Sequence, residues 1–268
     1  MPEVSISGKN KAHFRGNFSD QEIHLRNEER INFGRGLRVL CAKMINTKAL
    51  DNPVWNALNE SHQQFARNFG GLKFYDPDIG PFAAFDGNNR VADEIDQYST
   101  IIDDFFVVGD KPEYSAKVNF VGELVCLQMI CEKKISITHK EEIHLMSKHH
   151  NKEVQDLVSL VMPGYFKKRT MDLGEYFGIF QSGQLVAVTG ERMKMDQCTE
   201  VSAVVTHSDH SGKGYAKELV AHTVNNIFDK NELPFLHVAE SNQRAISVYE
   251  KLGFKTRRKM SFWRFQRR

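Results

Sequence analysis

The sequence predicts a protein of the α/β class, in which strands and helices alternate along most of the chain. Two observations carry this prediction. Short runs of β-branched and aromatic residues recur between glycines, prolines and polar turns, which is typical of strands. Between several of these runs, apolar residues are spaced i, i+3, i+4 and i+7, as in amphipathic helices. At 268 residues, the chain is long enough for one large or two modest domains with buried cores.

Differences in composition divide the chain into three expected segments. Residues 1–43 are polar, mildly basic and without periodicity, which predicts a poorly ordered extension. Residues 44–139 are expected to form a smaller N-terminal α/β half. Residues 140–268 are expected to form a second domain, because the polar segment 133–140 separates two groups of apolar runs.

In the N-terminal half, apolar spacing predicts a helix from Pro53 to Phe69, with Asn52 as N-cap and a glycine pair after its end. Further apolar runs predict a strand at 81–85, a helix at 91–102 and strands at 105–108 and 118–131. No catalytic set of residues stands out here. The turn Tyr75–Asp78 holds two carboxylates around a proline and is interpreted as a turn, not as a metal site.

In the second half, the apolar runs and their spacing predict the element order β-α-β-β-β-α-β-α-β. These elements are expected at 143–146, 154–161, 176–180, 185–193, 201–205, 216–228, 235–239, 242–252 and in the last fourteen residues. The final segment is basic, but its alternating apolar residues favour a strand over a nucleic-acid-binding tail.

The strongest chemical signal lies between Glu200 and Phe254. A buried strand at 201–205 is followed by a polar turn and by Gly212-Lys213-Gly214, where a helix begins. The first N–H groups of a helix are unpaired and lie at the positive end of its dipole, and glycines let a phosphate approach the backbone. The sequence therefore predicts a phosphate or pyrophosphate site made mainly of backbone.

Two common nucleotide-binding motifs fit this site poorly. A Walker loop is excluded, because no GxxxxGK[ST] string surrounds Lys213. A dinucleotide-binding turn has the strand, the GxG and an acidic residue, Glu240, after the next strand. However, Lys217 stands where that motif has its third glycine, and little chain remains for the rest of such a sheet. We therefore do not expect an NAD-dependent oxidoreductase.

Two motifs resemble those of the GNAT superfamily of N-acetyltransferases. Residues 211–216 resemble its Q/R-x-x-G-x-G/A loop, with Ser211 in place of the first Arg or Gln. Residues 242–254 match its N-x-x-A-x-x-x-Y-x-x-x-G-F element in full. The resemblance implies the GNAT fold, a mixed and mostly antiparallel sheet flanked by helices, with acetyl-CoA as co-substrate. From residue 51 the chain also resembles a GNAT subgroup with a degenerate, GNAT-like N-terminal half.

The resemblance also implies roles for individual residues. The splayed strand before the loop would bind the pantetheine arm and the thioester, the loop would bind the pyrophosphate, and an asparagine would bind the pantetheine amide or cap its helix. The cofactor-binding residues implied in this way are Val204, Val205, Thr206, Ser211, Gly212, Lys213, Gly214, Tyr215, Ala216 and Asn242.

Two residues are expected to carry protons. Tyr249 has the position of the family's general acid, and a phenol with a pKa near 10 is protonated at neutral pH. Glu200 has the spacing to the glycine loop that the base glutamate has in histone-acetyltransferase members of the superfamily. Glu191 on the preceding strand and His237 remain alternative bases, although a histidine inside an apolar strand is more often a hydrogen-bonded core residue.

We therefore expect an acetyl-CoA-dependent N-acetyltransferase whose acceptor is a small-molecule or peptide amine. The alternative is a catalytically silent module that binds or senses acyl-CoA, which the serine at 211 favours. A net charge of +2 with 26% charged residues calls for no nucleic-acid or membrane partner. The four cysteines lack paired spacing, and neither a signal peptide nor a membrane span is evident, so a cytoplasmic protein is expected.

Overall fold

The strands of the computed structural model, which describes residues 47–138 and 140–268, form one mixed sheet. They are β1 (Ala66–Phe69), β2 (Leu72–Tyr75), β3 (Phe82–Phe85), β4 (Asp104–Val108), β5 (Val118–Cys131), β6 (His144–Leu145), β7 (Tyr176–Gln181), β8 (Gln184–Lys194), β9 (Cys198–Thr206), β10 (Leu233–Ala239) and β11 (Phe254–Arg267). Their order in the sheet is β1-β2-β3-β4-β11-β5-β10-β9-β8-β7-β6. Among the described strands, only β3 with β4 and β9 with β10 pair in parallel, which confirms the predicted mixed, mostly antiparallel sheet.

Helices flank this sheet. They are α1 (Pro53–Asn59), α2 (Ala92–Ser99), α3 (Asn151–Val161), α4 (Tyr215–Asp229) and α5 (Gln243–Lys251), with short 3-10 turns at Thr47–Asp51, Gln63–Phe65, Lys148–His150, Thr170–Leu173 and Ser208–His210. From β6 onward the order is β-α-β-β-β-α-β-α-β, as the sequence predicts. A helix of suitable length and apolarity to cross a membrane is absent from the described part of the chain.

The helix predicted from Pro53 to Phe69 is shorter than expected. It begins at Pro53 but ends at Asn59, and the chain then enters β1. Gly70, with φ of +55°, and its neighbour close a hairpin between β1 and β2 and do not end a helix. Asn52 does not cap the helix with its side chain, which instead donates to the carbonyl oxygen of Phe85 at 2.7 Å.

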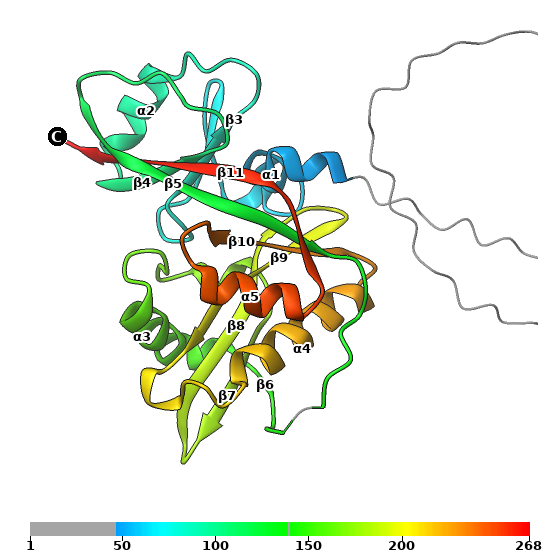
Figure 1. Cartoon of the computed structure of the whole chain (residues 1–268). Helices are drawn as coiled ribbons and strands as arrows, with labels where there is room; N and C mark the ends of the chain where they lie inside the picture. The colour runs from blue at the N-terminus through cyan, green and yellow to red at the C-terminus, as the bar shows by residue number, and fades with distance from the viewer. Residues whose placement is uncertain (1–46, 139) are drawn as a thin grey trace, which may run out of the picture. The chain divides into compact units, whose positions relative to one another are not determined.

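The two longest strands, β5 and β11, pair along nearly their whole length, and Figure 1 shows them side by side in green and red. β11 also pairs with β4, and β5 also pairs with β10. The sheet is therefore continuous between the segments on either side of residue 139. The boundary between residues 139 and 140 stays a prediction, and the extension expected at 1–43 lies outside the described residues.

The faces of the sheet carry different helices. On one face, the apolar side chains of α4 and α5 pack against β9 and β10, with Val201 and Leu236 among the contacts. On the other face, α3 packs against β8 and β9, including Val188 and Val205. This arrangement leaves the first turn of α4 and the end of β9 at the same edge of the core, where the predicted phosphate site lies.

Candidate active site

Strands β9 and β10 diverge in the middle of the sheet. They pair only where Leu233–Phe235 lie beside Cys198–Glu200. Beyond Glu200, β9 continues along β8 as far as Thr206, while β10 continues along β5 as far as Ala239. The strand that the GNAT resemblance assigns to the pantetheine arm is thus separated from its neighbour over residues 201–206.

A β-bulge lies in the diverging part of β9. The register shifts between the pairs Val188–Val205 and Gly190–Ser202, and Ala203 has φ of +49°. The extra residue reverses the alternation of side chains, so that Val204 packs on the α4 side of the sheet and Val205 on the α3 side. Nothing in the sequence signals this bulge, since alanine does not favour a left-handed conformation.

The glycine loop has the backbone that a phosphate site requires. Gly212 and Gly214 have φ of +82° and +96°, and Gly214 is the N-cap of the fifteen-residue helix α4. A Cβ placed on either glycine would meet no other atom within 4 Å, so open space adjoins both residues. The unpaired N–H groups of the first turn are therefore accessible to an anion.

A cleft of 610 Å³ adjoins this loop. It is lined by Val161, Val204, Thr206, Ser208, His210, Ser211, Gly212, Gly214, Tyr215, Ala216, Lys217, Val220, Asn242, Arg244, Ala245, Val248 and Tyr249. Most of the predicted cofactor-binding residues lie in this lining, but Val205 and Lys213 do not. Val205 packs toward α3, and the ammonium of Lys213 lies 3.3 Å from Nδ1 of His210.

Sequence reasoning missed two cations of the cleft, Lys217 and Arg244. Neither makes an ion pair or a side-chain hydrogen bond with a described residue, and no Asp or Glu belongs to the lining. Lys217 follows the glycine loop in α4, and Arg244 stands in the first turn of α5. Since α4 and α5 both border the cleft, these cations give it a positive potential that suits a polyanion.

The polar groups of the cleft fit CoA as a ligand. Oγ1 of Thr206 is buried and has no hydrogen-bond partner in the described part of the chain. A ligand amide or carbonyl would supply that partner. Asn242 accepts the N–H of Ala245 at 3.1 Å, so it caps α5 as expected and keeps its side-chain amide donors.

Tyr249 lies at the wall of the cleft and is 9% exposed. Its ring contacts Phe254 edge-on, with 5.8 Å between the ring centres. Burial raises the pKa of Tyr249 to about 12. The phenol therefore stays protonated at neutral pH and is able to donate a proton to a group in the cleft.

Glu200, the predicted base, lies in the interior and not in the lining of the cleft. Nε and Nη2 of Arg192 each donate to one of its oxygens at 2.7 Å, and His237 Nδ1 lies 2.7 Å from Oε1. Burial alone would raise the pKa of Glu200, but Arg192 and His237 lower it to about 2. A carboxylate whose pKa is lowered in this way is a weak acceptor for the proton of an alkylammonium. These bonds weigh against Glu200 as the general base, and its role stays a prediction.

Neither alternative base is better placed. Glu191 is buried and accepts from Lys230 at 2.7 Å, near the C-terminal end of α4. Nε2 of His237 lies 3.2 Å from the side-chain nitrogen of Gln128, which can only donate, so this ring nitrogen accepts and Nδ1 donates to Glu200. His237 is thus the hydrogen-bonded core histidine that its position in an apolar strand predicts.

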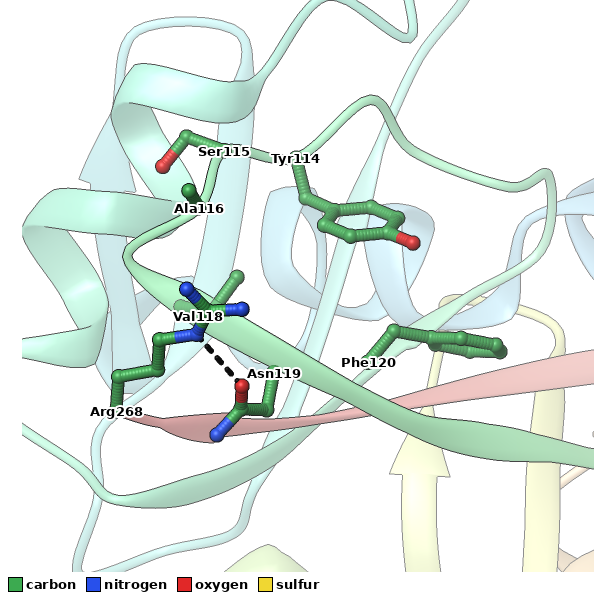
Figure 2. Close-up of a pocket in the computed structure, with 7 residues that line it drawn as sticks. All are labelled: Tyr114, Ser115, Ala116, Val118, Asn119, Phe120 and Arg268. Carbon is green, nitrogen blue, oxygen red and sulfur yellow. Dashed lines mark hydrogen bonds between the residues drawn. The ribbon is translucent and has the colours of Figure 1, made fainter.

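A second cavity, of 420 Å³, lies beside the first residues of β5 (Figure 2). Arg268 donates to Asn119 at 2.7 Å, and Tyr114 and Phe120 present their rings beside this pair. The hydroxyl of Ser115 is hydrogen-bonded to Asp96. The lining of this cavity contains no nucleophile–base pair. Nor does any group of three or more metal-binding side chains occur among the residues that the structure describes.

Comparisons with known proteins identify similar sequences and folds. A family model described as FR47-like protein matches residues 176–263. A protein from Novosphingobium aromaticivorans, described as a GNAT-family acetyltransferase, is 28% identical, with a TM-score of 0.73 over 82% of this chain and 98% of that one. No curated protein matches the chain.

More distant structures share the fold. A GCN5-related N-acetyltransferase-like protein from Streptococcus suis has a TM-score of 0.54 at 14% identity, over 80% of this chain and 93% of that one. One from Kribbella flavida has a TM-score of 0.51 at 14% identity, over 79% and 95%. The fold is that of acyl-CoA-dependent N-acetyltransferases in general. The family-model match and these structural neighbours support membership of the chain in the GNAT superfamily.

Proposed function

We propose that the protein transfers the acetyl group of acetyl-CoA to a primary amine by direct attack of the amine on the thioester. One observation carries the proposal. The same cleft contains the left-handed glycines before α4, the unpartnered hydroxyl of Thr206 and the protonated phenol of Tyr249. Acetyl transfer from the thioester of CoA requires a site that binds the phosphates, polar groups that bind the pantetheine arm, and an acid that protonates the thiolate.

Each part of the cleft has a role in this proposal. The backbone N–H groups of residues 212–216 bind the pyrophosphate, and Lys217 and Arg244 add charge in place of the long side chain missing at Ser211. Thr206 and Asn242 hydrogen-bond the pantetheine arm, which lies along Val204. Acetyl-CoA supplies the activated acyl group as a thioester.

Proton transfer is divided between the protein and solvent. Tyr249 donates its proton to the departing thiolate. Because Glu200, Glu191 and His237 are all hydrogen-bonded in the interior, the amine loses its proton to water before or during attack. We expect the protein to act in the cytoplasm on small-molecule or peptide amines, without nucleic-acid or membrane partners.

One observation favours a second function, an acyl-CoA-binding module without catalysis: the lining of the cleft contains no carboxylate that could serve as a base. Acetyl-CoA affinity by isothermal titration, together with release of CoA thiol across a panel of amines, separates the two functions. Amine-dependent release supports the enzyme. Tight binding of acetyl-CoA with no release from any amine would replace the enzyme with the sensing module.

A further inference from the structure

Arg192 lies beside the point where β9 and β10 diverge, on the face of the sheet opposite α4. Val201 packs against α4, and the preceding residue, Glu200, therefore projects to the other face, where it binds Arg192. The side chain of Glu200 is 1% exposed and that of Arg192 is 16% exposed. The two hydrogen bonds from Arg192 to Glu200 use Nε and Nη2, and Nη1 donates to no described residue. Of this ion pair, Arg192 is therefore the member that solvent or a ligand can reach.

A second arginine is held in the same way. Nε and Nη2 of Arg264, on β11, donate to the two oxygens of Asp104, on β4. Its Nη1 also makes no hydrogen bond with a described residue, and its side chain is 42% exposed. In both arginines, Nε and Nη2 of the guanidinium therefore bind the carboxylate partner, and Nη1 makes no hydrogen bond with a described residue.

Aromatic rings lie between the two arginines: the guanidinium of Arg192 lies 4.7 Å from the Phe82 ring, whose centre lies 6.0 Å from that of Phe106. The ring of Tyr165 stacks on Phe106 of β4, with 5.5 Å between ring centres, and the guanidinium of Arg264 lies 6.0 Å from the same Phe106 ring. Burial raises the pKa of the Tyr165 hydroxyl, and both Arg264 and Arg192 act to lower it. The hydroxyl thus lies within the electrostatic reach of both guanidinium groups.

The unused polar groups around Tyr165 are donors. Glu200 and Asp104 are the acids of this region, and each has both oxygens bound by an arginine. The two Nη1 nitrogens and the phenol make no hydrogen bond with a described residue, and the rings of Phe82 and Phe106 form apolar walls. Hydrogen-bond donors favour an anion as ligand where the neighbouring carboxylates are already paired. Guanidinium groups bind carboxylates especially well.

We propose that the acceptor amine carries a carboxylate, which Arg192 and Arg264 bind beside Tyr165 on the face of the sheet opposite α4. The inference rests on the proposed function. The acyl donor occupies the cleft on the α4 side, and the amine reaches the thioester through the diverging strands from the other side. A carboxylate held there leaves the amine end of a short ω-amino acid directed toward β9. The substrate class is therefore amino acids and peptides or metabolites with a carboxylate near the amine.

The test uses matched pairs of acceptors with acetyl-CoA. Each ω-amino acid from glycine to 6-aminohexanoate is compared with the alkylamine of the same carbon number, and release of CoA thiol is followed. At least one amino acid is expected to have a kcat/KM tenfold or more above that of its alkylamine. Arg264→Gln and Tyr165→Phe should each reduce this ratio several-fold, because they lower kcat/KM for the amino acid more than for the alkylamine.

The control is Arg267→Gln, a neighbouring arginine of β11 that pairs with Asp103. It should keep the preference, and all variants should bind CoA with wild-type affinity in titration calorimetry. Equal rates for amino acids and alkylamines, or a preference that survives Arg264→Gln, would overturn the inference while the proposed function stands. If no amine releases CoA, the proposed function fails. Calorimetric binding of the amino acids to CoA-saturated protein then decides the inference: binding that Arg264→Gln abolishes supports it, and absence of binding refutes it.

Discussion

Replacing Glu200 with Gln tests the interior ion pair most directly. The substitution keeps the shape of the side chain but leaves the charge of Arg192 without its carboxylate. Removing one partner of a buried ion pair costs about 3–5 kcal/mol. At pH 7 the free energy of unfolding of Glu200→Gln should be lower than that of wild type by this amount, as measured by urea denaturation followed by circular dichroism.

The pH dependence of this difference identifies its cause. The folded-state pKa of Glu200 is about 2, against 4.5 for an unperturbed glutamate, so its ionisation stabilises the folded state above pH 4.5. This contribution, about 3 kcal/mol in total, is lost as the pH falls through the folded-state value. Between pH 6 and pH 3, about 2 kcal/mol of the difference between wild type and variant should disappear.

Glu142→Gln is the matched control, because its side chain is 83% exposed. Its effect on stability should be small at every pH. A difference between wild type and Glu200→Gln that stays constant from pH 6 to pH 3 would refute the argument, since it would mean that Glu200 is not held ionised by Arg192.

The remaining predictions concern the cleft and its chemistry. Lys217→Gln and Arg244→Gln should each weaken CoA binding by about 1 kcal/mol in calorimetry. Lys251, an exposed residue of α5, lies outside the cleft, so Lys251→Gln should bind CoA like wild type. The same CoA affinity in all three variants would show that Lys217 and Arg244 do not bind the phosphates. Tyr249→Phe should lower turnover by about 10²-fold without changing CoA affinity, and recovery of the rate at pH 9.5 would contradict an acid role. Gly214→Ala should lower the free energy of unfolding by about 1 kcal/mol, because φ is +96° there; an unchanged urea midpoint would show that the loop relaxes.

The second half of the fold could be predicted because its signals are local. The turn at Ser182-Gly183, the glycines before α4 and the cap at Asn242 each lie next to the element that they begin or end. The N-terminal half was less predictable. Apolar residues between 65 and 69 fit a helix or a strand, and pairing with β2 decided the outcome. The long β5–β11 pair joins residues more than a hundred positions apart, which no local pattern encodes.

The candidate site divides in the same way. Its backbone part follows from glycine positions, and most of the implied residues do line the cleft. Its side-chain part depends on which residues the strand registers bring together. Arg192 meets Glu200 only because β8 pairs with β9 in one register, and His237 joins them from β10. Spacing from the glycine loop does not reveal these partners of Glu200, because they come from other strands of the sheet.

The described part of the N-terminal half, residues 47–138, helps to form the face of the sheet opposite α4. It binds the loop that carries Tyr165 through the backbone: Arg169 N donates to Asp78 O at 2.7 Å, and Thr170 Oγ1 donates to Ile79 O at 2.8 Å. The same segment supplies Phe106, on which Tyr165 stacks. The cleft proposed for the acyl donor is lined only by residues of the second half, but the opposite face needs residues from both halves. Changes in the N-terminal segment should therefore alter the choice of acceptor before they alter the affinity for CoA.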